Sequence, residues 1–166
     1  MPGCMLEFHG DYPLRKANWP DPETGLILFA TQVGQLFFER QREPLSPTLY
    51  LFLRGDGGEV LLRTATPVVD SGDATQHAFA HLMVSYALSE QFIGALVAAE
   101  SKDGGPKCKG VECLALHLRS KKGLLQGRIH TFVRENPGDL PTPLLPTQIM
   151  DPSDISYNDS WMTPGQ

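Results

Sequence analysis

The apolar run from Phe92 to Ala99 constrains the fold of this chain more than any other segment. It reads Phe-Ile-Gly-Ala-Leu-Val-Ala-Ala, so a strand formed here has no polar face to turn toward water. Strands of this kind lie in the middle of a sheet that is covered on both sides. The run is also much shorter than the roughly 20 residues that cross a bilayer. The sequence therefore predicts a covered sheet in a soluble protein without membrane contact.

A β-hairpin is predicted before this run. Side chains alternate with a period of two over residues 49–53, and residues 59–66 mirror that pattern. The sequence Arg-Gly-Asp-Gly-Gly at residues 54–58 supplies the turn. No Lys-Ser or Lys-Thr pair follows these glycines, which disfavours a phosphate-binding loop.

Two segments have the spacing of amphipathic helices. The first begins at Asp21, a suitable N-cap that is followed by Pro22, and its apolar residues recur every three or four positions up to Phe37. The second runs from Asp73 to about Leu88. Because this helix connects the hairpin to the apolar run, we expect that run to lie parallel to a strand of the hairpin.

A second hairpin is predicted from residue 111 to residue 134, with its turn at residues 120–123. In the register that this turn implies, the numbers of opposite residues sum to 243. Leu118 then faces Leu125, and Cys113 faces His130. Cys113, His117, Arg128 and His130 would share one face of this hairpin.

Together these segments predict a single α/β domain of α+β character over residues 21–136. Its order is α-β-β-α-β-β-β, with a five-stranded mixed sheet packed by two helices. Residues 1–20 contain three prolines and are expected to form an irregular N-terminal arm. Residues 137–166 contain six prolines and are expected to form an extended, acidic, Pro-rich tail. Apolar residues in the tail indicate that it packs on this subunit or on another.

Charge is strongly segregated along the chain. Residues 102–134 carry eight Lys or Arg and two acids, whereas residues 135–166 carry five acids and no Lys or Arg. Such a segment can bind a protein partner or the acidic tail, can follow a nucleic-acid backbone, or can simply be solvated. Only one aromatic residue, Phe132, accompanies it, which weakens the nucleic-acid interpretation. The candidate contact residues are Arg119, Lys121, Lys122 and Arg128.

Two sets of residues could carry chemistry. His77 and His81 have the i, i+4 spacing of helical metal ligands, but Ala78 stands where a zinc protease has its glutamate. Cys113 opposite His130, with His117 nearby, could form an activated thiol. Both patterns are incomplete, so an enzyme of either kind is the alternative and not the preferred interpretation.

Glu100 ends the apolar run and is a further candidate ligand-binding residue, because α/β sheets place ligands at the carboxyl ends of parallel strands. The three cysteines are too few for a secreted disulfide framework, which favours a cytoplasmic protein. The preferred prediction is a non-catalytic binding or assembly protein without a cofactor. It would use the basic hairpin and the apolar tail to contact a protein partner or a second copy.

Overall fold

The structure is a computed structural model that describes residues 5–14, 19, 21–101 and 112–151. Its described part is an α+β fold with two helices and eight strands, which confirms the predicted class. The elements follow one another as β1 (Leu6–Leu14), α1 (Pro22–Arg40), β2 (Thr48–Arg54), β3 (Val60–Pro67), α2 (Asp73–Ala87), β4 (Phe92–Ser101), β5 (Cys113–Ser120), β6 (Gly123–Val133), β7 (Thr142–Pro143) and β8 (Gln148–Met150).

All strand pairs in the described sheet are antiparallel. The order is β1-β3-β2-β4-β5-β6-β7, and β8 also pairs with β6. The predicted mixed, five-stranded sheet is therefore wrong in strand count and in type. β4 does run in the same direction as β3, as expected from the crossover through α2, but β2 lies between them.

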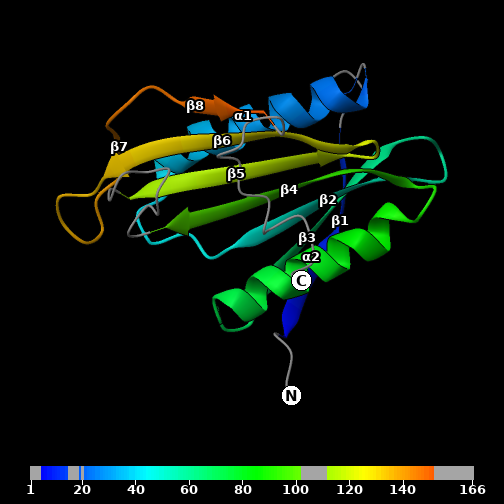
Figure 1. Cartoon of the computed structure of the whole chain (residues 1–166), viewed down its shortest axis with the longest axis horizontal. Coiled ribbons are helices and arrows are strands. Elements are labelled where there is room, and N and C mark those ends of the chain that lie inside the picture. Colours follow the sequence, from blue (N-terminus) through cyan, green and yellow to red (C-terminus); the bar gives the residue numbers. More distant parts are fainter. Residues whose placement is uncertain (1–4, 15–18, 20, 102–111, 152–166) are drawn as a thin grey trace.

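The two helices cover opposite faces of the sheet, which we call the α1 face and the α2 face (Figure 1). Leu26, Ala30 and Phe37 of α1 pack on a cluster that includes Phe52 and Leu96. The α1 helix begins as the sequence predicts, because the Asp21 carboxylate accepts a hydrogen bond from the Thr24 N–H at 2.9 Å.

The α2 face is built by alternate residues of the same strands. Phe79 and Met83 of α2 pack against Leu49, Leu51 and Val97. Every residue of the run from 92 to 99 is buried. The expected central, two-sided strand is therefore confirmed.

Gly94 of β4 lies directly beneath Leu26 of α1. A Cβ atom at this position would lie 2.5 Å from Cδ1 of Leu26 and 2.6 Å from the carbonyl oxygen of Arg119. A Cβ atom essentially never lies this close to a non-bonded atom, so the packing of β4 against both α1 and β5 requires a residue without a side chain here.

Segments expected to be irregular contribute strands. Residues 6–14, within the predicted arm, form β1, which pairs with β3. The described part of the tail, residues 137–151, forms β7 and β8 on the outer edge of β6, and Met150 is buried there. Over these residues the tail packs on its own sheet. Within the described part, no helix is long and apolar enough to cross a membrane.

Candidate functional site

The β5–β6 hairpin follows the predicted register only beside its turn. Arg119 pairs with Leu124 as expected, but Leu125 has no partner, and Leu118 pairs with Gln126. Beyond this β-bulge the pairing is displaced by one residue, so that His130 faces Leu114. A displacement of one residue moves a side chain to the other face of the sheet.

This displacement separates the predicted thiol–imidazole pair. Cys113 lies opposite Thr131, on the α2 face, whereas His130 lies on the α1 face. Cys113 is also disulfide-bonded, so it carries no free thiol. The chain's other cysteines, Cys4 and Cys108, lie outside the described residues. The predicted pairing of Cys113 with His130 is wrong, and the structure offers no nucleophile at Cys113.

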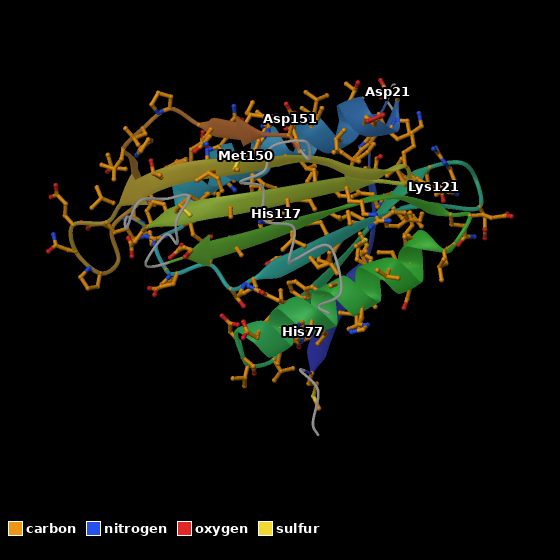
Figure 2. The ribbon with its side chains drawn as sticks, in the orientation of Figure 1. Asp21, His77, His117, Lys121, Met150 and Asp151 are labelled. Carbon is orange, nitrogen blue, oxygen red and sulfur yellow. The ribbon has the colours of Figure 1, made fainter. Side chains whose placement is uncertain are left out.

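The other candidate histidines do not lie close together. His77 and His81 are exposed on α2, whereas His117 is buried in the middle of the sheet. Figure 2 shows His77 on α2, well separated from His117. Within the described residues, no group of three His, Cys, Asp or Glu side chains could hold a metal ion.

His130 belongs to β6, and its side chain lies between α1 and the segment that joins β7 to β8. Its Nδ1 atom lies 3.0 Å from the Thr147 hydroxyl, and its ring lies 5.9 Å from that of Phe38. Gly34 of α1 allows this approach, since a Cβ there would lie 3.2 Å from the imidazole. Burial and the charge of Arg128 hold the pKa of His130 below its usual value.

This lowered pKa predicts a loss of stability in acid. Below the ordinary histidine pKa of 6.5, unfolded chains bind a proton at His130 that folded chains resist. The free energy of unfolding should therefore fall as the pH drops through this value, and the fall should be shallower in His130→Asn. Urea unfolding between about pH 7.5 and pH 5.5 measures it. The exposed His81→Asn is the control, and an unchanged slope in His130→Asn would contradict the assignment.

The basic segment does not form one surface. Arg128 donates a hydrogen bond to the Thr31 hydroxyl of α1 at 2.8 Å. Lys121 and Lys122 lie at the β5–β6 turn, and Arg134 is buried near the other end of β6. Lys102, Lys107 and Lys109 lie outside the described residues. Arg119 pairs with Ala95 of the α2-face cluster. The described basic residues are therefore distributed over both faces and both ends of the sheet.

Glu100 is held in a buried ion pair. Its carboxylate accepts two hydrogen bonds from the Arg134 guanidinium, at 3.1 and 3.3 Å, and one from the Leu45 N–H at 3.3 Å. The exposed fractions of the two side chains are only 4% for Glu100 and 9% for Arg134. The sheet has no parallel pair among its described strands. The argument that placed a ligand at Glu100 is therefore wrong, because it required parallel neighbours.

A cleft of about 390 Å³ opens at one end of the sheet. Figure 2 shows Asp21 and Lys121 at this end. Lys121 Nζ donates to the Glu90 carbonyl oxygen at 3.1 Å. The charged residues that line the cleft are three acids and three bases, namely Asp21, Glu23, Glu90, Arg54, Lys121 and Lys122. The balance of charge selects neither an anionic nor a cationic ligand.

The two long edges of the sheet differ. The outer edge of β6 is covered by β7 and β8, whereas β1 pairs with β3 alone in the described structure. Phe8 and Tyr12 of β1 have exposed fractions of 48% and 58%. Met5, Val68 and Val69, at one end of this strand, are also exposed. An open edge flanked by exposed apolar side chains is typical of a contact with another polypeptide.

Comparisons with known proteins do not assign the chain: no family model, no curated protein and no solved structure matches it.

Proposed function

We propose that this chain is a non-catalytic binding or assembly protein that accepts an extended segment of another polypeptide along the β1 edge. The observation that carries this proposal is the difference between the two edges of the sheet. The chain covers the β6 edge with its own residues 142–150, while β1 has a single neighbour in the described part. Edge strands of this kind bind extended segments through their main-chain groups.

The charge on β1 favours this role. Asp11 forms a two-pronged ion pair with Arg63 of β3, with both N–O distances at 2.8 Å. Hydrogen bonding from Arg63 holds the pKa of Asp11 below its usual value. The carboxylate is therefore neutralised within its own sheet. The two acids of β1 are Glu7 and Asp11, so only Glu7 still carries a charge that would repel an incoming acidic strand.

The irregular geometry of β1 gives the edge selectivity. Pairing with β3 shifts between His9 and Tyr12, so two residues of β1 stand where a regular strand has one. Pro13, near the end of the strand, has no N–H to donate. Both features oppose indiscriminate pairing. An incoming strand must match the bulge, and this requirement restricts the partners that β1 can accept.

Peptide selection tests the proposal. A library of random peptides of about ten residues, panned against the immobilised protein, should yield extended sequences with alternating apolar residues. Their affinity should fall about tenfold in Tyr12→Asp, because the mutation removes an exposed aromatic contact and adds a charge. Titration followed by amide chemical shifts should place the peptide on β1.

The matched control for this experiment is Leu36→Asp. Leu36 is an exposed leucine of α1, with an exposed fraction of 45%. Its replacement removes an exposed apolar side chain from α1 and adds the same charge outside the β1 edge, so peptide affinity should not change. Selected peptides whose affinity is equal for wild type and Tyr12→Asp would overturn the proposal.

A further inference from the structure

We infer that the segment that occupies the β1 edge is the β1 strand of a second copy, so that two chains form a continuous antiparallel sheet around a two-fold axis. This inference rests on the proposed function of the edge and names its partner. A strand can pair with its own copy in this way only if its two halves are complementary in face and in charge.

The bulge in β1 limits the registers that such a dimer can use. Before it, Phe8 lies opposite Ala65 on the α2 face; after it, Tyr12 lies opposite Leu62 on the α1 face. Directly opposed residues of antiparallel strands point to the same face. Each pair joins a residue before the bulge in one copy to a residue after the bulge in the other. The bulge exchanges the faces of the odd-numbered and even-numbered residues, so the two residue numbers of a pair must sum to an odd value. A strand without a bulge would require an even sum.

Among odd sums, 19 and 21 pair the largest part of β1, because the strand runs from Leu6 to Leu14. A sum of 19 would place Phe8 opposite Asp11 of the second copy. A sum of 21 instead places Phe8 opposite Pro13 and His9 opposite Tyr12, each pair occurring twice. Cross-strand contacts between rings favour the second register.

Charges are also compatible with a sum of 21. Asp11 then lies opposite Gly10, where a side chain would meet no atom within 4 Å, and it keeps its own partner Arg63. Glu7 lies opposite Leu14. Neither acid of one strand faces an acid of the other, so the like-charge repulsion that would oppose pairing is absent from this register.

Disulfide trapping tests the register. In the double variant His9→Cys, Tyr12→Cys, each introduced thiol would lie opposite its counterpart in the second copy, at a Cβ separation of about 5 Å that a disulfide can span. Mild oxidation should produce a covalent dimer. The control His9→Cys, Leu36→Cys has the same number of thiols but no opposed pair, and it should remain monomeric on a denaturing, non-reducing gel.

Sedimentation velocity from about 1 µM to about 1 mM provides the second measurement. Wild type should convert from monomer to dimer over this range, and Tyr12→Asp should require at least about a tenfold higher concentration. A wild type that stays monomeric, or a dimer that Tyr12→Asp leaves unchanged, overturns the inference. Because the peptide experiment is independent, selected peptides that still bind at β1 would then leave the proposed function standing with a different partner.

Discussion

Replacing Arg134 by methionine is expected to lower the free energy of unfolding by about 3–5 kcal/mol. The substitution leaves the Glu100 carboxylate buried without its partner, since that side chain is 4% exposed. Arg134 also donates a hydrogen bond to the Gln41 carbonyl oxygen at 2.8 Å, and its guanidinium lies 5.5 and 5.1 Å from the ring centres of Phe37 and Phe132. Urea unfolding at neutral pH measures the change.

Two further variants separate the ion pair from simple loss of a side chain. Arg40→Met removes an exposed arginine from the last turn of α1 and should change the free energy of unfolding by no more than about 0.5 kcal/mol. The double variant Glu100→Leu, Arg134→Met removes both charges and should regain most of the lost stability. If Arg134→Met costs less than about 1 kcal/mol, water or movement of the chain must reach Glu100 and the assigned role is wrong.

The second large effect is expected at Gly94. Gly94→Ala should cost up to about 3 kcal/mol, because its methyl group would meet both Leu26 and the backbone oxygen of Arg119. The leucine can rotate away, but the backbone oxygen belongs to β5 and cannot move without disturbing the pairing of β4 with β5. Thermal and urea unfolding should both report the loss.

Gly10→Ala is the matched control for this substitution. Gly10 lies in β1 and has no atom within 4 Å of the position that a Cβ would take. Its replacement by alanine should therefore change the free energy of unfolding by no more than about 0.5 kcal/mol. A Gly94→Ala protein as stable as Gly10→Ala would show that α1 can shift away from β4 without loss.

The elements with a strong local pattern could be predicted from the sequence. The α1 helix begins at its capping residue, Asp21, and the run from Phe92 to Ala99 is the buried strand that its composition requires. β1 was missed, since Gly10, Pro13 and a bulge disrupt the alternation that identifies a strand. Whether neighbouring strands are parallel depends on their spatial order in the sheet, here β3-β2-β4, and no local pattern records that order.

The arrangement of the candidate residues could be predicted only in part. The register with Leu118 opposite Leu125 seemed favourable since it paired two leucines. In the structure a bulge at Leu125 instead places Arg128 and His130 beneath α1, where Thr31 and Gly34 accommodate them. These compensating contacts come from a helix about a hundred residues earlier in the chain, so the hairpin sequence alone could not reveal them.

The cluster of basic residues in the sequence likewise could not show whether these residues form one surface. Basic residues that are close in the chain lie on different faces, because successive side chains of β5 and β6 alternate between the two faces of the sheet. Arg134, which contributed to the predicted basic surface, is held by a carboxylate at the end of β4. A count of charges along the chain therefore overestimated the positive surface that a partner would meet.

The position of β1 also has a consequence for the order of folding. Its partner in the sheet is β3, so β1 cannot pair until α1, β2 and β3 have all been synthesised. Contacts between such distant segments form late and slowly. β1 should be among the last strands to join and the first to open, with rapid amide hydrogen exchange. The edge proposed for assembly would then exist only in chains that have completed folding, which would keep nascent chains from pairing with one another too early.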